Sequence, residues 1–396
     1  MVQVFTNANF PLMGRTKWFF IVFSAIAVAI SVTTMLTRGF NYGIDFAGGT
    51  AVRLKLRETP RIEQMRVALE GAGLGGVSIQ TIGGAADNEV LIRIEQQSTQ
   101  SSPVAGEGGE ISRRVQEALQ APEQRQAAQA GKIDLNAISE SDLKDWLATR
   151  LSPVAGGGSQ GPDPAASAAA IVRYRTEHAG LFTDISAIAT ISGLNPDAAR
   201  LLRENAILGP FAVRGVDFVG PTAGKELLQN TFLAVFGSVT GILLYVWLRF
   251  KKWMWGLTSV IALVHDVVIA AGAVSLTRKE FSLDVVAALL TILGYSINDT
   301  IVVFDRIREN LRLYREVDFE TLVNASINQT LSRTFLTSFT VFIAIMALFL
   351  YGGDKLNPLS FCLMVGVVFG TYSSVFVAAA LLVIVYRRLG AKYVRY

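Results

Sequence analysis

Long apolar runs and polar stretches alternate along the chain, and the apolar runs fall into two groups. One run lies near the N-terminus, and five follow in quick succession in the second half of the chain. A helix that crosses a bilayer needs about 20 consecutive apolar residues, and six runs approach or exceed this length: Trp18 to Leu36, Leu228 to Leu248, Met254 to Leu276, Leu283 to Phe304, Thr334 to Tyr351 and Pro358 to Tyr386. The pattern predicts an α-helical polytopic membrane protein with a first span over residues 18–37 and a five-helix domain over residues 228–386.

The polar stretch between the first and second spans, residues 38–227, has the shorter periods of a soluble domain. Val52, Leu54 and Leu56 alternate with charged residues, as in a half-buried strand, whereas residues 60–71 have apolar positions at helical spacing. The same reading predicts further strands over residues 76–82, 89–95 and 211–219 and a helix over residues 110–121. This order of elements is that of a split βαβ unit, so we expect an α+β ferredoxin-like domain.

An insertion over residues 131–209 interrupts this domain before its last strand. Its middle, residues 155–170, is rich in Gly, Pro, Ser and Ala, and we expect it to remain unordered between two small helical pieces because it buries little surface. Residues 181–202 have the spacing of a helix-hairpin-helix with Gly193 at the turn. That motif often binds nucleic acid, but an exported position leaves no nucleic acid to bind. A protein-contacting or spacer role is the favoured interpretation.

Composition and charge agree with a membrane protein that carries a soluble domain. The chain is 51% hydrophobic with a mean hydropathy of +0.40 and a net charge of +4. With the N-terminus inside, the short inner flanks hold thirteen basic residues: Arg15, Lys17, Arg249, Lys251, Lys252, Arg306, Arg308, Arg312, Arg315, Arg387, Arg388, Lys392 and Arg395. The outer flanks hold three, namely Arg278, Lys279 and Lys355.

This imbalance places the N-terminal residues 1–17 and the tail, residues 387–396, in the cytoplasm and the domain of residues 38–227 outside, as a periplasmic domain. The inner basic residues are then expected to contact anionic membrane lipid. The first span has no small-residue cleavage site directly after it, so we interpret it as an uncleaved anchor. The single cysteine, Cys362, lies in the last span and leaves no disulfide for the outer domain.

The fourth span carries an aspartate, Asp299, within the segment Gly294–Asn310. A charged side chain in a membrane costs at least about 2.5 to 3.5 kcal/mol, so we interpret Asp299 as functional. It lies about 24 Å along the helix from Leu283, in the inner part of the membrane, and Arg333 opens the next span from the same side. Burial disfavours the charged carboxyl and a guanidinium favours it, so the pair is suited to taking up and releasing protons. The alternative for Arg333 is a cation that reaches the membrane edge.

Other polar residues in the spans have two readings each. Ser296 and Tyr295 precede Asp299 by three and four residues on one helical face, where a hydroxyl can hold the carboxyl or a water; they can equally be packing contacts, as can Asn298. His265 and Asp266 lie near the middle of the third span, about 100° apart around the helix, so we do not expect them to face one target. They form either a proton relay or a polar pair bonded to neighbouring helices.

The sequence has no nucleotide-binding, zinc-protease or paired-cysteine motif. We therefore predict neither an enzyme nor a resident cofactor or metal.

Five segments together resemble the SecF members of the SecD/SecF family of bacterial protein export. They are Asn41–Thr50 (NYGIDFAGGT), Val219–Leu227 (VGPTAGKEL), His265-Asp266, Gly294–Asn310 (GYSINDTIVVFDRIREN) and Ser332–Thr340 (SRTFLTSFT). The resemblance covers the six-span layout and most of the outer domain. The insertion over residues 131–209 is longer than this family usually carries, and its role stays open.

The resemblance implies a half-bundle related to the resistance-nodulation-division (RND) transporters, in the bacterial inner membrane. It implies work beside SecD, the SecYEG channel and the translocating secretory polypeptide, with YajC as a further candidate partner. A gradient of H⁺ or Na⁺ is expected to drive late steps of export through Asp299 and Arg333, whose further aspartate partner belongs to SecD. Two alternatives remain: a passive scaffold of the export complex, and half of an RND-type efflux transporter, for which one six-span chain supplies only half of the bundle.

Overall fold

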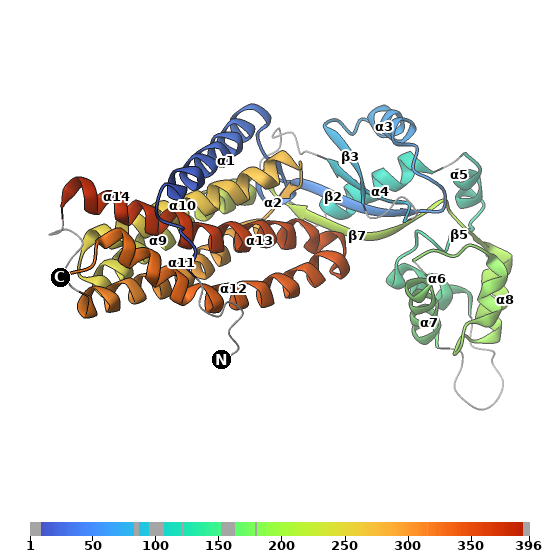
Figure 1. The fold of residues 1–396 in the computed structure, drawn as a ribbon. Coiled ribbons are helices and arrows are strands. Elements are labelled where there is room, and N and C mark those ends of the chain that lie inside the picture. The colour runs from blue at the N-terminus through green and yellow to red at the C-terminus, as the bar shows by residue number, and fades with distance from the viewer. Residues whose placement is uncertain are drawn as a thin grey trace. The chain divides into compact units, whose positions relative to one another are not determined.

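The computed structural model describes residues 9–82, 87–94, 107–120, 122–151, 163–178, 180–314 and 316–390. The chain divides into two compact units, a soluble unit of Ala47–Gly224 and a membrane unit of Met1–Phe46 and Lys225–Tyr396 (Figure 1). Predictions for residues 1–8, for residues 155–162 of the insertion, for Arg315 and for residues 391–396 lie outside the described residues.

A four-stranded antiparallel sheet organises the soluble unit, with strand order β3-β4-β2-β7. Its elements are β2 (Gly49–Leu56), α3 (Ile62–Gly71), β3 (Val77–Ile82), β4 (Glu89–Ile94), α4 (Glu107–Leu119) and β7 (Phe211–Val219). The first and third strands lie in the centre and the second and fourth at the edges. This confirms the predicted ferredoxin-like α+β domain.

The sheet is held to its two helices by one apolar core. Val52 and Leu54 of β2 and Ile92 of β4 are fully buried against Leu69 of α3 and Val115 of α4. Val52 pairs directly with Ile92 in the ladder between β2 and β4. The alternation seen in the sequence therefore fixes which face of the sheet the helices cover.

The insertion folds around a core of its own. It contains β5 (Ile133–Asp134), α6 (Glu140–Arg150), α7 (Pro164–Glu177), the 3-10 helix η1 (Ile185–Thr190), α8 (Pro196–Asn205) and β6 (Ala206–Ile207), and α5 (Pro122–Gln129) precedes it. The expectation of an unordered linker is wrong for residues 164–170, which form the first half of α7. Ser167 and Ala168 there are buried against α6, because small side chains allow the two helices to approach closely.

The expected helix-hairpin-helix is only partly present. Gly193 does lie at the turn, with a φ of 84°, and Asn195 caps α8 by accepting from the backbone N–H groups of Asp197 and Ala198. The first helix of the pair is instead the six-residue 3-10 helix η1.

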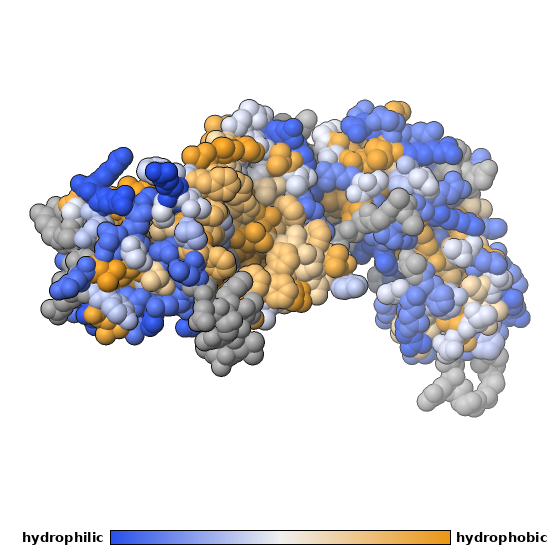
Figure 2. All heavy atoms as spheres, viewed as in Figure 1, coloured by the Kyte–Doolittle hydropathy of each residue, from blue (hydrophilic) through white to orange (hydrophobic). Residues whose placement is uncertain are grey.

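Six helical segments of the membrane unit are long and apolar enough to span a bilayer, as predicted. They are α1 (Thr16–Arg38), α9 (Pro221–Phe250), α10 (Trp253–Leu276), α11 (Leu283–Leu313), α12 (Phe319–Tyr351) and a last segment of α13 (Gly353–Ser373), the π-helix η2 (Ser374–Ala378) and α14 (Ala379–Leu389). Figure 2 shows a continuous hydrophobic surface along these helices, with hydrophilic side chains around the end where α14 finishes.

The sequence predicts that the soluble domain begins at residue 38, but the soluble unit begins at Ala47. Residues 39–46 belong to the membrane unit, where β1 (Asn41–Tyr42) pairs in parallel with β8 (Glu280–Phe281) and α2 (Ile44–Ala47) follows. Asp45 Oδ2 accepts a hydrogen bond of 2.9 Å from the backbone N–H of Leu283 at the start of α11. These contacts tie the segment after the first span to the loop between the third and fourth.

Gly48 lies where the chain leaves this segment for the sheet. Its φ is 70°, and a Cβ there would lie 2.9 Å from the Cα of Pro221, the first residue of α9. Only glycine fits this backbone and this close approach.

The segment before the first span is fixed to α12. Asn324 Oδ1 accepts from the backbone N–H of Leu12 at 2.8 Å, and Asn328 Oδ1 accepts from that of Phe10 at 2.9 Å. Lys17 forms an ion pair of 2.9 Å with Glu320 one turn earlier on the same helix. The start of α12 is thereby held, and α12 carries Arg333 and Ser338 further along.

Candidate functional site

Asp299 lies on the buried side of α11, with 2% of its surface exposed. Its Oδ2 accepts a hydrogen bond of 3.2 Å from the hydroxyl of Ser338 on α12. A buried carboxylate has room for about four such bonds, so most of its acceptor capacity is unused by the described hydrogen bonds.

Ser338 connects Asp299 to two further helices. Its Oγ accepts from the hydroxyl of Tyr295 on α11 at 3.1 Å and from that of Thr371 on α13 at 2.6 Å. A serine hydroxyl has one proton and two lone pairs. Ser338 therefore uses its full capacity, and its single proton is directed at Asp299.

Arg333 is exposed on the surface of this chain and forms no ion pair with Asp299, although its charge acts on that carboxylate. The two residues lie near enough for this electrostatic effect but are not paired directly. Asn298 is exposed on α11 and, among the described hydrogen bonds, joins none of this network.

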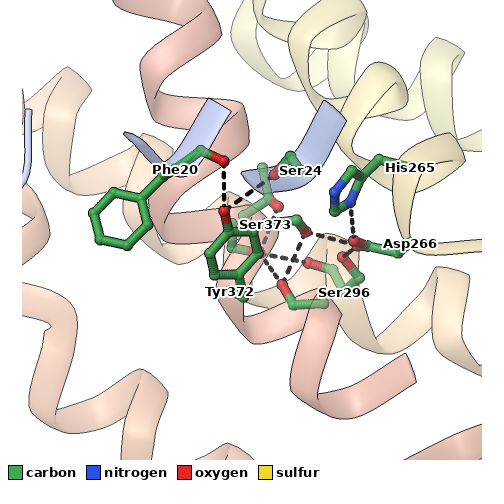
Figure 3. A network of polar contacts seen from close by, with 10 residues as sticks. Phe20, Ser24, His265, Asp266, Ser296, Tyr372 and Ser373 are labelled. Atoms are coloured by element: carbon green, nitrogen blue, oxygen red, sulfur yellow. Dashed lines mark hydrogen bonds and ion pairs between the residues drawn. The ribbon is translucent and has the colours of Figure 1, made fainter. Parts of the chain in front are cut away.

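A second carboxylate, Asp266 on α10, is fully buried. Its Oδ2 accepts from Ser296 of α11 at 2.6 Å and from Ser373 of α13 at 2.7 Å, and its Oδ1 lies 2.9 Å from Nδ1 of His265 (Figure 3). The carboxylate thus joins three helices of the bundle.

This geometry refines one expectation and corrects another. His265 and Asp266 contact each other rather than a common target, and Asp266 also bonds to neighbouring helices, as in the polar-pair interpretation. Ser296 does not support Asp299, since its hydroxyl donates to Asp266. Tyr295 alone of the two supports Asp299, and it does so through Ser338.

Four consecutive residues of α13 and η2 reach four different helices, a feature that the sequence analysis missed. Thr371 donates to Ser338 of α12, Tyr372 to the carbonyl of Phe20 on α1, and Ser373 to Asp266 of α10. Ser374 shares a hydrogen bond of 2.9 Å with Thr300 of α11. The run TYSS is the only signal in the sequence, and it looks like ordinary packing polarity.

Gly370, directly before this run, allows the close approach of α13 to α11. A Cβ at Gly370 would lie 3.1 Å from Cβ of Ser296 and 3.7 Å from Oδ2 of Asp266. The π-helix η2 begins at Ser374, the last residue of the run, and π-turns often occur at functional sites.

The arrangement is suited to binding and releasing small cations or protons. Among the described residues no three His, Cys, Asp or Glu side chains cluster as a metal site would require, and Cys362 is buried without a disulfide. Two carboxylates instead bond hydroxyls of neighbouring helices: Asp266 bonds Ser296 of α11 and Ser373 of α13, and Asp299 bonds Ser338 of α12.

Two family models match the chain. The model "Protein export membrane protein SecD/SecF, C-terminal" covers residues 203–388 and therefore both carboxylates. The model "SecD/SecF GG Motif" covers residues 34–59, which include Gly48 and Gly49.

Proteins similar to this chain over nearly its whole length are described as the SecF subunit of protein translocase. The chain is 39% identical to protein translocase subunit SecF of Koribacter versatilis over 96% of its own length and 93% of the relative. It is 32% identical to that of Calditerrivibrio nitroreducens over 96% and 95% of the two chains.

Among solved structures, the crystal structure of SecDF from Thermus thermophilus, described as a translocon-associated membrane protein, matches with 30% identity and a TM-score of 0.64. The match covers 96% of this chain but 39% of that one, so this chain spans about two fifths of SecDF. A second SecDF structure, in a super-membrane-facing form, matches with a TM-score of 0.52. The chain therefore belongs to the SecD/SecF family of protein export membrane proteins and corresponds to its SecF subunit along nearly its whole length.

Proposed function

We propose that this SecF subunit works with a SecD partner and uses a transmembrane ion gradient to drive late steps of protein export. The carrying observation is Asp299, a carboxylate in the fourth span with 2% exposure that is held by one serine hydroxyl. A membrane protein seldom keeps such a group without using it. The positive charge of Arg333 acts on Asp299 and would stabilise its carboxylate whenever the proton is absent.

The hydrogen bonds around Ser338 give a route from protonation to helix movement. Ser338 donates to Asp299 while it accepts from Tyr295 and Thr371. If Asp299 gains a proton at Oδ2, its hydroxyl can donate to Ser338. The oxygen of Ser338 would then face three donors with only two lone pairs, so one donor must turn away. Thr371 has an alternative acceptor in the carbonyl of Val367, 2.8 Å away. The protonation of one residue on α11 thereby changes contacts of α12 and α13.

The available energy is sufficient for mechanical work on a polypeptide. Each charge that crosses a potential of 100 mV releases about 2.3 kcal/mol. The chain passes between the two units at only two points, after Phe46 and after Gly224. Helix movements would reach the soluble unit through these two connections.

The proposal places the chain in the bacterial inner membrane, with both termini in the cytoplasm and the soluble unit on the outer side. SecYEG, YajC and the secretory polypeptide are its proposed further partners, and H⁺ or Na⁺ is the coupling ion. The mechanism makes and breaks no covalent bond apart from proton transfer, so the protein would act as a coupled transporter rather than an enzyme. The 39% coverage of SecDF is consistent with a SecD portion as the missing part of the assembly.

The test is translocation of a secretory precursor into membrane vesicles that contain this chain, SecD and the channel. We expect Asp299→Asn to abolish the gradient-dependent part of translocation at equal protein level. Asp284→Asn, on the same helix but in its first turn, is the matched control and should behave as wild type.

A normal gradient-dependent rate in Asp299→Asn would contradict the proposal. The chain would then be a scaffold of the export complex, and Asp299 a packing residue.

A further inference from the structure

The imidazole of His265 has one nitrogen without a hydrogen-bond partner. Only 8% of the residue is exposed, and its Nε2 is buried with no partner among the described residues. Nδ1 lies 2.9 Å from Oδ1 of Asp266. The ring lies nearly parallel to that of Tyr372, with centroids 6.4 Å apart, and near Phe369.

The contacts of Asp266 determine which nitrogen is available. Two serine hydroxyls donate to its Oδ2, which is the arrangement of an ionised carboxylate that accepts on every side. The N–H of His265 is then expected on Nδ1, facing Oδ1, and the lone pair on Nε2. A carboxylate that bonds an imidazole in this way fixes the tautomer and the orientation of the ring.

The charges around the pair are few. α10 holds no other charged residue, and the nearest ones before and after it are Lys252 and Arg278. α1 has none between Lys17 and Arg38, and the last segment has none between Lys355 and Arg387.

The facing part of α11 contributes one charged residue, Asp299, together with the phenol of Tyr295, and α13 contributes the phenol of Tyr372. With His265 neutral, the carboxylate of Asp266 would therefore be a buried anion without a neighbouring cation. A protonated His265 would neutralise it.

We propose that Nε2 of His265 is a second proton-binding site of the bundle, with Asp266 as its fixed counter-anion. In the binding step a hydronium ion gives its proton to the Nε2 lone pair and leaves as water, and release is the reverse. The pair is neutral when the proton is bound and carries one negative charge when it is not. The role of this proton in export rests on the proposed function.

The two sites share the same two helices. Ser296 of α11 and Ser373 of α13 both contact Asp266 (Figure 3). Asp299 follows Ser296 three residues later on α11, and Thr371 of α13 contacts Ser338. A change of charge at one site that moves α11 against α13 alters the hydrogen bonds at the other. Occupancy of the two sites should therefore be coupled.

Nitrogen NMR of histidine tests this directly, because the chain has two histidines. The full chain, labelled with ¹⁵N-histidine and assembled with SecD in lipid nanodiscs, is titrated over a range of pH. His178 is exposed in the insertion, so His178→Gln assigns the remaining signal to His265. We expect the His265 signal to change from imidazolium to the neutral form with N–H on Nδ1, and Asp266→Asn to shift the midpoint by about one pH unit or more.

Two serines of α13 provide a matched comparison. Ser373→Ala, which removes a donor to Asp266, should move the midpoint, whereas Ser360→Ala should not. Ser360 is equally buried but bonds the carbonyls of Leu356 and Asn357 in its own helix. Asp299→Asn should also move the midpoint if the sites are coupled.

A His265 signal that stays in one neutral form from about pH 5 to 9 would overturn the proposal and leave the pair as a structural hydrogen bond. This readout does not depend on export. If His265 does not titrate but export still depends on Asp299, the second site alone is rejected. If export does not depend on Asp299 but His265 does titrate, the proposed function alone is rejected.

Discussion

Asp266 and Asp299 are two buried carboxylates of one helical bundle, and their surroundings differ. Asp266 has contacts from three side chains on three helices: His265, Ser296 and Ser373. Asp299 has one, the hydroxyl of Ser338. Both residues are almost completely buried, so the difference lies in the number of hydrogen-bond donors and not in access to solvent.

The comparison separates a structural anion from an exchangeable one. A carboxylate with several donors is stabilised in its charged form, and losing that charge would break contacts with three helices. A carboxylate with one donor and a nearby arginine can change its protonation at a smaller structural cost. This difference supports the ion-coupling role proposed for Asp299 and the role proposed for Asp266, which is to hold His265.

The same substitution at the two positions should have unequal effects on stability. In Asp266→Asn an amide NH₂ replaces an acceptor oxygen and faces donors, so we expect a loss of about 2 kcal/mol of unfolding free energy. Asp299→Asn keeps an oxygen for Ser338 and should lose less than about 1 kcal/mol. Denaturant titration of the protein in bicelles measures both.

Equal losses in the two variants, or a larger loss in Asp299→Asn, would remove the basis of the comparison. The two carboxylates would then be equally structural.

Removing the single donor to Asp299 sharpens the comparison. Ser338→Ala leaves Asp299 without its hydroxyl and breaks its connection to Tyr295 and Thr371. One hydrogen bond is worth about 1 kcal/mol, so we expect about a fivefold fall in gradient-driven translocation, smaller than in Asp299→Asn. The vesicle assay described above measures it.

Ser360→Ala is the control, since that hydroxyl serves only its own helix. If Ser338→Ala matches this control, Ser338 does not transmit the state of Asp299.

A third carboxylate, the partly buried Asp134 of the insertion, extends the comparison outside the membrane. Burial raises its pKa above the usual 3.8, although backbone N–H groups of Gly209 and Asn136 donate to it. The folded insertion therefore keeps this proton to a higher pH than the unfolded chain does. The resulting stability is fully present below the unfolded pKa and is lost as pH rises through the folded pKa.

We expect this to be the smallest of the three effects. Hydrogen exchange of peptides from residues 131–209 in the full chain, corrected for intrinsic rates, should show faster opening as pH rises above about 4. Asp134→Asn should remove that dependence. An unchanged pH profile in this variant would mean that another group titrates.

The spans and the sheet could be predicted because their signals are periodic. Runs of about 20 apolar residues and the alternation around Val52 and Leu54 depend on burial alone. The ordered start of α7 could not be predicted, because Ser167 and Ala168 are stabilised by packing against α6, a tertiary contact that the local sequence pattern does not encode.

The sequence singled out the charged residues of the candidate site and the hydroxyl of Tyr295, but not the hydroxyls of α13. Asp299 is conspicuous because a carboxylate is rare in an apolar run. Thr371 and Ser373 are ordinary residues in membrane helices, and only the packing of α13 against α10, α11 and α12 gives them partners. Partner choice among hydroxyls depends on tertiary contacts, as the assignment of Ser296 to Asp266 also shows.

Ion flux through the assembled complex tests the central claim most directly. The chain and SecD are reconstituted into vesicles with the channel and a translocating polypeptide, and flux of H⁺ or Na⁺ is recorded with an ion-sensitive dye as a gradient is imposed. The account predicts flux in the wild type and in Asp284→Asn, and none above background in Asp299→Asn at equal protein level. Undiminished flux in Asp299→Asn would contradict it, because the gradient would then be used without this carboxylate.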